Sequence, residues 1–244
     1  MSKLKNFIVL FLILCVHGAV FADESIIKVG ASSPLVADLV RSIGGNRVEV
    51  AIFPKWEGVK AVFWMGKELE PEVYKRIRAL EHIPKVGLLG YVPRIDDNPY
   101  EYFDALAIKV FVYRVSKVLK RLDPKGWGYY QRNLSRYSLA IDGVFRDGRW
   151  SMANFNEKVV YTLSPHFSYL LKGLGLREKR IAVENLKTVK GVVIDNPEQP
   201  LEQPLPKGIL LVRLMANLNE ELNTYLDLLK ENIMTLSLAL SQIK

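Results

Sequence analysis

The chain has 244 residues, with 34 lysines and arginines against 26 aspartates and glutamates, which gives a formal net charge of +8 at pH 7. This length predicts one large domain or two small lobes, either of which can bury its own core. The positive charges are distributed along the chain, so we expect a basic surface and no nucleic-acid partner.

The first residues have the pattern of a secretory signal. Lys3 and Lys5 precede an apolar run at residues 7–16, and a short segment follows that ends in the small residue Ala22. An apolar run of this length is too short for a spanning helix, which needs about 20 residues. We therefore expect cleavage after Ala22 and a periplasmic or secreted protein.

Cys15 is the only cysteine, and Leu14 stands before it where a lipoprotein would have a small residue. We therefore expect no lipid anchor. After cleavage the chain would have no cysteine, which excludes a disulfide framework, a thiolate metal site and a cysteine nucleophile.

The first half of the mature chain alternates short β-branched segments with helical ones, which is typical of a parallel α/β architecture. A helix should begin at Ser32 or Ser33, and a second should cover residues 70–80. From Asp104, a predicted N-cap, apolar residues recur every three or four positions and predict a long buried helix. The strands of this half are expected at residues 26–30, 48–53, 60–64 and 84–89.

Asp123-Pro124 should end that helix and start a second one of mixed polarity, which we expect to join two lobes and to end before a turn at Asp147-Gly148. Beyond the turn, a helix should open at Pro165, and the last helix should cover residues 219–243. The strands of the second half are expected at residues 158–163, 180–183, 191–194 and 209–213.

The predicted fold is therefore α/β, with two small lobes built on parallel sheets, a long rigid linking helix, and a ligand cleft between the lobes. The expected boundaries are a signal peptide at 1–22, an N-terminal lobe at 23–123, the linking helix at 124–146 and a C-terminal lobe at 147–244.

Several segments, in order, resemble the zinc- and manganese-binding periplasmic receptors of ABC importers, the TroA-like or ZnuA-like family. The similar segments are Ala61-Val62-Phe63-Trp64-Met65-Gly66 with Leu69-Glu70-Pro71, Tyr129-Tyr130-Gln131-Arg132-Asn133-Leu134, Phe167-Ser168-Tyr169-Leu170, and Thr224-Tyr225-Leu226-Asp227-Leu228-Leu229. The resemblance implies a monomeric solute receptor that is not an enzyme, that works with an ABC permease in the inner membrane, and that carries zinc or manganese.

The ligands of that family, histidines and a carboxylate drawn from both lobes, are not matched here. The segment for the first histidine is shortened to residues 54–58, Tyr100 stands in place of the second, and His166 in Leu163-Ser164-Pro165-His166 is displaced by two positions from the third. The late aspartate falls at or near Arg213. The candidate cleft residues are Tyr100, Glu101, Ser164, His166 and Arg213, with His166 and Glu101 as weak candidates for a metal site.

Other roles remain open for several of these residues. His166 could cap its helix, and Arg213 could pair with an anionic ligand or form an ordinary salt bridge. His82 suits the end of a helix, where a cationic side chain is stabilised. Trp56, Phe63 and Trp64 could floor a cleft or belong to the core.

Three functions follow from this pattern. The first is a solute receptor of an ABC importer. The second is a divergent paralogue that binds no metal and acts as an accessory or interaction protein of the cell envelope. The third is an exported enzyme, which would need His166 and Glu101 as a titratable pair, because the chain has no known catalytic motif.

Overall fold

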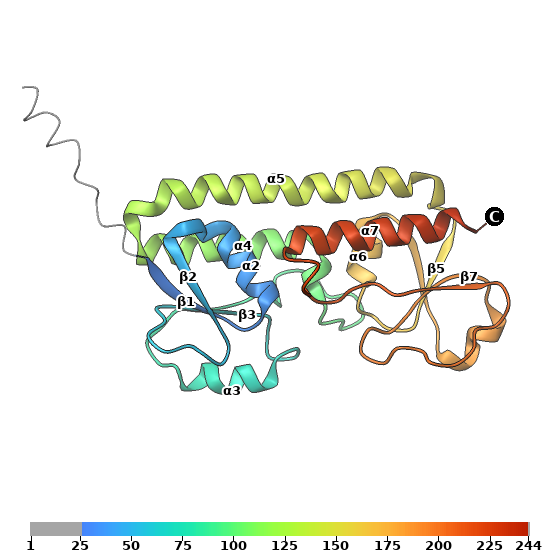
Figure 1. The fold of residues 1–244 in the computed structure, drawn as a ribbon, viewed down its shortest axis with the longest axis horizontal. Coiled ribbons are helices and arrows are strands. Elements are labelled where there is room, and N and C mark those ends of the chain that lie inside the picture. Colours follow the sequence, from blue (N-terminus) through green and yellow to red (C-terminus); the bar gives the residue numbers. More distant parts are fainter. Residues whose placement is uncertain (1–25, 244) are drawn as a thin grey trace, which may run out of the picture.

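The computed structural model describes residues 26–243, which form two α/β lobes joined by a long helix (Figure 1). The predicted signal peptide, with Lys3, Lys5, Cys15 and Ala22, lies outside the described residues. The predicted fold class is confirmed. The division into lobes at the expected residue numbers stays a prediction.

The N-terminal lobe contains a sheet of four parallel strands in the order β2-β1-β3-β4. Ser33 caps α2, because its hydroxyl accepts a hydrogen bond from the Val36 amide. The elements of this lobe are β1 (Ile27–Ala31), α2 (Pro34–Gly44), η1 (Gly45–Arg47), β2 (Val48–Ile52), β3 (Val62–Trp64), α3 (Pro71–Ala79), β4 (Lys85–Gly87) and η2 (Glu101–Phe103).

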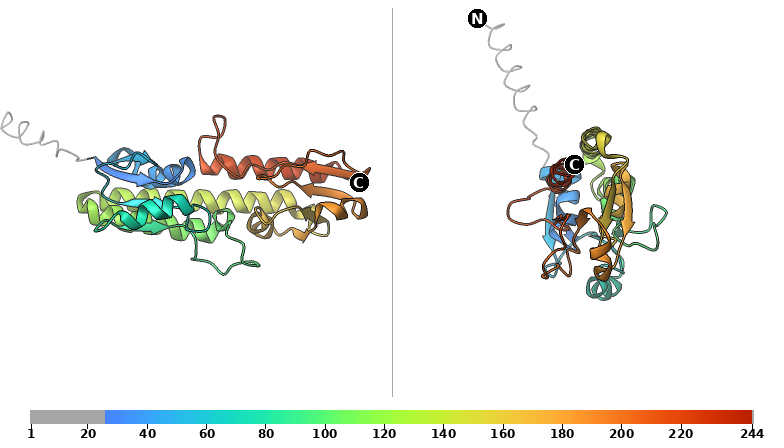
Figure 2. Two further views of the ribbon diagram at one scale, coloured as in Figure 1. Left: turned by 90° about the horizontal axis from the view of Figure 1, so that it is seen from below. Right: turned by 90° about the vertical axis from the view of Figure 1, so that its right-hand side faces the viewer.

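Two long helices follow as a hairpin. The helix α4 (Ala105–Leu122) begins at its predicted cap, Asp104, whose carboxylate accepts hydrogen bonds from two backbone amides of the first turn. After η3 (Pro124–Gly126), the linking helix α5 (Trp127–Met152) spans both lobes (Figures 1 and 2). The turn expected at Asp147-Gly148 is wrong, because both residues lie within α5, where Gly148 packs closely against the C-terminal lobe.

The C-terminal lobe repeats the topology of the first, with four parallel strands in the order β6-β5-β7-β8. Its elements are η4 (Ala153–Phe155), β5 (Val159–Thr162), α6 (Ser168–Gly173), β6 (Arg177–Arg180), η5 (Val183–Thr188), β7 (Gly191–Ile194), β8 (Ile209–Val212) and α7 (Tyr225–Ser241).

Three boundaries in this lobe differ from the prediction. The strand expected at 180–183 lies instead at Arg177–Arg180, and the helix expected from Pro165 begins at Ser168. The last helix begins at Tyr225, because the Asn219 side chain folds the preceding residues into a turn and Thr224 provides the cap.

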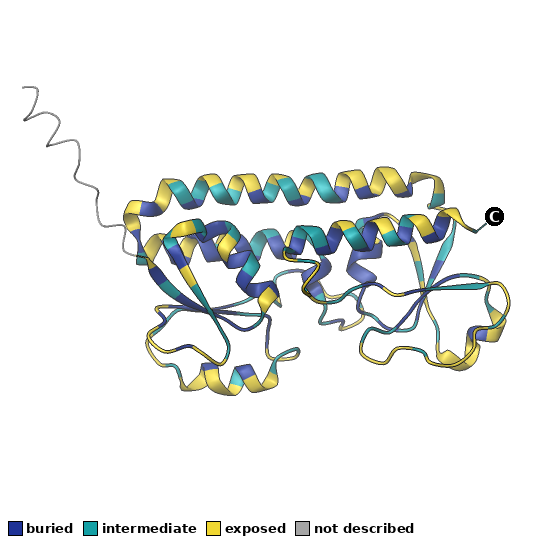
Figure 3. Ribbon diagram, viewed as in Figure 1, coloured by how far each residue is buried: buried dark blue, intermediate teal, exposed yellow. Residues whose placement is uncertain are grey.

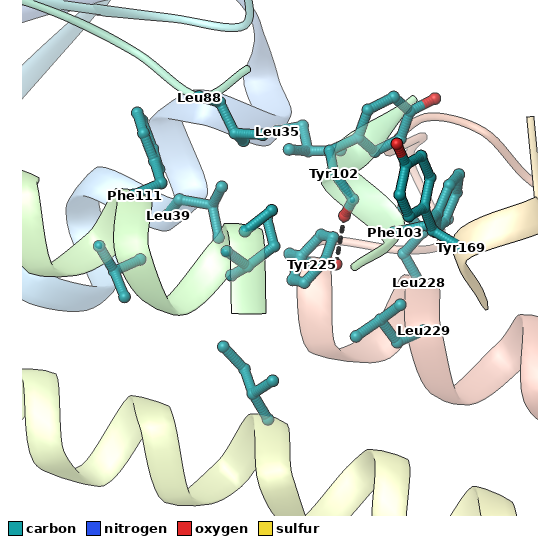
Figure 4. Packing of buried hydrophobic residues seen from close by; sticks show 14 of the residues in the cluster. Leu35, Leu39, Leu88, Tyr102, Phe103, Phe111, Tyr169, Tyr225, Leu228 and Leu229 are labelled. Atoms are coloured by element: carbon teal, nitrogen blue, oxygen red, sulfur yellow. Dashed lines mark hydrogen bonds between the residues drawn. The ribbon is translucent and has the colours of Figure 1, made fainter. Parts of the chain in front are cut away.

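Buried side chains form a continuous core that runs through both lobes (Figure 3). At the junction, the ring centroids of Phe103 and Phe167 are 5.0 Å apart. The Tyr225 hydroxyl donates a hydrogen bond to the Tyr102 carbonyl, which ties α7 to the N-terminal lobe (Figure 4). None of the helices within residues 26–243 is long and apolar enough to cross a bilayer.

Candidate functional site

A pocket of about 200 Å³ lies between the two lobes, and both contribute to its wall. This is the place where parallel sheets present the loops that follow their strands. The N-terminal lobe contributes Ser33, Met65, Leu69, Glu70, Tyr100 and Tyr102, and the C-terminal lobe contributes His166, Pro197, Glu198, Ala216 and Asn217.

One hydrogen-bonded group joins the two sides of the pocket. The Tyr100 hydroxyl donates to Oε1 of Glu198 at 2.9 Å, and Nε2 of His166 lies 3.1 Å from the same oxygen. The His166 and Tyr100 rings are stacked with their centroids 3.6 Å apart. The sequence therefore identified two members of the group, while Glu198 was missed because it lies in a proline-rich connection with no recognisable motif.

Ser164 contacts the ring nitrogen of His166 that does not face Glu198. Its hydroxyl lies 3.1 Å from Nδ1 of His166, in a buried contact. His166 itself is buried and lies in the turn before α6, so it does not occupy the first turn of a helix as the sequence suggested.

Burial determines the protonation of the group. It lowers the pKa of His166, and the interaction with Glu198 only partly opposes this effect, so the imidazole is neutral at pH 7. Burial, and then the hydrogen bond to Glu198, raise the pKa of Tyr100 to about 12. A neutral imidazole beside a carboxylate has the form in which histidine binds metal ions.

A second carboxylate, Glu70, lines the opposite side of the pocket. Its Oε2 accepts a hydrogen bond of 2.7 Å from the Met65 amide, and burial raises its pKa. Glu70 was noted in the sequence only as part of Leu69-Glu70-Pro71, and its place beside α3 gave no sign that it would face the second lobe.

Glu101 belongs to the interior of the N-terminal lobe and does not line the pocket. Its carboxylate is fully buried, accepts a hydrogen bond from the Gly90 amide at 2.8 Å and pairs with Nε of Arg94 at 3.0 Å. Arg94 also bridges to Glu68. The structure therefore does not bring Glu101 and His166 together as an acid–base pair.

Arg213 also lies outside this pocket, in a neighbouring hollow of about 350 Å³. Its Nε donates to Oδ2 of the buried Asp195 at 3.1 Å, and its Nη2 donates to the Leu201 carbonyl. Of the two roles left open by the sequence, the structure shows the salt bridge. Asn217, not Arg213, lines the pocket on this side.

The remaining candidates are accounted for elsewhere. Trp56 is buried and donates its indole N–H to the Ala31 carbonyl at 3.1 Å, Phe63 is a core residue, and Trp64 stacks on Tyr74. Trp56, Phe63 and Trp64 do not line the pocket. His82 lies after α3, with its side chain 92% exposed.

The donor set for a metal ion is small. Within residues 26–243, no group of three or more histidine, cysteine, aspartate or glutamate side chains is arranged to hold a metal ion. The donors in the pocket are His166 and Glu198, with Glu70 on the facing wall.

The sequence model of the family described as "Zinc-uptake complex component A periplasmic" matches residues 53–196, which is more than half of the chain. The chain belongs to this family. This result agrees with the resemblance drawn from the sequence motifs, and the matched range includes Glu70, Tyr100 and His166.

Similar proteins and solved structures agree with this family assignment. The manganese ABC transporter substrate-binding lipoprotein PsaA of Streptococcus mitis is 21% identical over 217 residues, covering 72% of this chain and 70% of PsaA, and the PsaA of Streptococcus anginosus matches equally well. The metal-dependent lipoprotein YcdH of Bacillus subtilis superposes with a TM-score of 0.73 at 15% identity, covering 88% of this chain and 99% of YcdH.

A further structure is the Zn(II)-bound ZnuA-like domain of Streptococcus pneumoniae AdcA. It superposes with a TM-score of 0.71 at 14% identity, over 89% of this chain and all of that domain. At these identities the superpositions establish the two-lobed fold and not the ligand.

Proposed function

We propose that the chain is an extracytoplasmic solute receptor of an ABC importer, and that its cargo is a divalent metal ion of the zinc or manganese type. The observation that carries this proposal is the pocket between the lobes, where the neutral imidazole of His166 and the carboxylate of Glu198 lie within 3.1 Å of each other. Family membership supports a receptor, which acts by binding and not by catalysis.

The ligand chemistry of the pocket supports a cation. Imidazole nitrogen and carboxylate oxygen are ligands that suit zinc and manganese. Two protein ligands leave further coordination positions, which water or Glu70 would complete. Asn217 and Ala216 stand on the same wall and add no charge, so the acidic side chains set the sign of the pocket.

The partners follow from the same proposal. A receptor of this kind would be exported by the signal peptide predicted at residues 1–22 and would act as a monomer that delivers its cargo to a permease in the inner membrane. Because α5 spans both lobes and the core is continuous between them, closure around the cargo should be small.

A second candidate is a divergent paralogue that binds no metal and acts as an accessory protein of the envelope. The absence of a three-ligand cluster within the described residues favours it. The hydrogen bonds among Tyr100, Glu198 and His166 also satisfy the polar groups of the pocket without a cargo.

Thermal unfolding of the exported protein, stripped with chelator and then mixed with zinc, manganese or iron, distinguishes these two functions. An ion present at a hundred times its Kd stabilises the folded state by about 2.7 kcal/mol, which raises the Tm of a chain of this size by roughly 5 to 10 °C. The shift should be lost in His166→Ala and in Glu198→Gln, and kept in His82→Ala, whose side chain is exposed far from the pocket. No shift with any of the three ions would reject the metal receptor and favour the paralogue.

A further inference from the structure

The largest concentration of positive charge lies on the hairpin of α4 and the first half of α5. Residues 105–140 contain eight lysines and arginines and a single acidic residue, Asp123, so this hairpin carries a net charge of +7 in a chain whose total is +8. The Asp123 carboxylate is already bound by Arg47 and Tyr130. The positive charge is therefore concentrated in one contiguous segment of the chain, and is not distributed evenly as we expected.

A hollow of about 480 Å³ lies on this hairpin, where α4 ends and α5 begins. It is lined by Tyr113, Lys117, Lys120, Arg121, Trp127 and Gln131. The two aromatic side chains are large and half exposed, Tyr113 at 48% and Trp127 at 46%. A lysine lies over each ring, with Nζ of Lys120 4.5 Å from the Trp127 ring centroid and Nζ of Lys117 5.4 Å from that of Tyr113.

The cations around the hollow are available to a partner. Among the described residues, no carboxylate lies within salt-bridge distance of Lys117, Lys120, Arg121 or Lys125. Lys109 lies one turn before Tyr113 in α4. It differs from the other lysines because Asp142 binds its Nζ at 2.7 Å. The surface therefore offers several uncompensated charges interleaved with two amphipathic rings.

We propose that the hollow and its lysines form a docking surface for an anionic bilayer. Lysine and arginine near such a surface are attracted to the lipid phosphates, and tryptophan and tyrosine sit at the depth of the headgroups, with their rings toward the hydrocarbon. The pairing of each exposed ring with a lysine fits a partner whose surface changes from charged to apolar over a short depth. An acidic protein surface would supply the charge without the apolar layer.

Docking would hold the receptor on the membrane that contains its permease, independently of which solute it binds. The proposal does not rest on the metal site, because none of the hollow's residues lines the pocket between the lobes.

Sedimentation with lipid vesicles tests the proposal. The protein is expressed with its own leader, the exported form is purified, and it is mixed with vesicles of phosphatidylcholine alone or with about one third phosphatidylglycerol, at low and at high salt. We expect binding to the anionic vesicles only, and weaker binding at high salt. In the triple variant Lys117→Glu/Lys120→Glu/Arg121→Glu, the partition coefficient should fall by about 100-fold, since each cation contributes up to about fivefold near such a surface.

A matched control has the same change in charge on the other lobe. Lys179, Arg180 and Lys187 are exposed, and their replacement by glutamate should leave vesicle binding within about threefold of the original. Trp127→Ala should weaken binding while the net charge is unchanged. The circular dichroism spectrum and the Tm of each variant verify that it is folded.

Three results would overturn the proposal. They are an absence of binding to anionic vesicles, equal losses in the triple variant and in its control, and binding to immobilised poly-glutamate through the same lysines without binding to vesicles. The last result would reassign the surface to an acidic protein.

Discussion

The two lobes are built on the same four-stranded parallel sheet, yet they contribute unequal chemistry to the pocket between them. Each lobe buries a carboxylate beside an arginine in a connection near the pocket, Glu101 with Arg94 in the first and Asp195 with Arg213 in the second. The C-terminal lobe then adds the imidazole of His166 and the carboxylate of Glu198 at the pocket wall. The N-terminal lobe adds aromatic side chains and a single carboxylate, Glu70.

The difference shows that a carboxylate near the carboxyl edge of a sheet is not automatically a ligand. Glu101 and Asp195 accept backbone N–H groups as well as an arginine, so their lone pairs serve to hold loops in place. Among the described residues, the Glu198 carboxylate contacts the side chains of Tyr100 and His166, and no backbone amide holds it in place. The pocket's chemistry therefore depends on loops that follow the strands, which the shared topology does not determine.

The most destabilising change should be one in the core that the two lobes share. Phe103 is fully buried and its ring contacts Phe167 of the other lobe, so Phe103→Ala should lower the free energy of unfolding by about 4 kcal/mol. Urea unfolding followed by circular dichroism measures this loss. Leu106→Ala, at a position that is 55% exposed, should cost less than about 1 kcal/mol. Equal costs for the two variants would show that the lobes do not depend on a common core.

The two buried pairs should respond differently to loss of their arginine. The Arg94 side chain is 29% exposed and that of Arg213 is 65% exposed. Arg94→Ala leaves Glu101 without a cation and should cost about 2 kcal/mol, whereas Arg213→Ala should cost about half as much, since water and two backbone amides can compensate Asp195. Denaturant unfolding of both variants measures the ranking.

A double variant sharpens this result. Arg94→Ala combined with Glu101→Gln removes the uncompensated charge, so its cost should be smaller than the sum of the two single changes. Additive costs would mean that Arg94 stabilises the lobe through Glu68 and not through Glu101.

The sequence predicted the architecture because its signals are local. The caps at Ser33 and Asp104, the proline at the start of α3 and the buried period of α4 all have short-range physical causes. The end of α5 was wrong for a tertiary reason. Asp147-Gly148 has the composition of a turn, but Gly148 lies where a side chain would meet Leu174 and Ile233, so its glycine serves close packing within a helix.

The pocket was only partly predictable. Tyr100 and His166, which line the pocket, and Ser164, which contacts His166, stand near positions that resemble family motifs, while Glu198 lies in a loop that no periodicity describes. Glu101 and Arg213 lie outside the pocket because each forms an ion pair elsewhere: Glu101 with Arg94, seven residues earlier in the same connection, and Arg213 with Asp195, 18 residues earlier. No periodicity of the sequence marks either pair.

The attachment of α5 also differs between the lobes, and pH tests that difference. At the N-terminal lobe it is polar, because Asp123 accepts from Arg47, Tyr130 and Gly126, whereas Gly148 allows apolar packing at the other lobe. Burial raises the pKa of Asp123, but these hydrogen bonds lower it more, so the folded-state pKa lies below 3.8. Its stabilisation is therefore complete above pH 3.8 and is lost as the pH falls toward the folded-state value.

Asp123→Asn should cost about 1.5 kcal/mol at pH 7, a loss of the size expected for a cap with an ion pair. The difference between the variant and the original protein should stay constant down to about pH 4 and shrink below it. Thermal unfolding across this range measures it. A difference that grows on acidification would mean that another carboxylate controls the acid stability of this end.

The smallest expected effect concerns the shortened segment after β2, in which the resemblance placed a first ligand. Here Trp56 folds back onto β1 through its indole N–H, so Trp56→Phe should keep the packing, lose one hydrogen bond and cost about 1 kcal/mol. If this segment only closes the N-terminal lobe, any rise in Tm produced by zinc or manganese should be the same in the variant as in the original protein. A smaller rise would show that the segment controls access to the cargo, and that the N-terminal lobe contributes more to binding than its side chains in the pocket indicate.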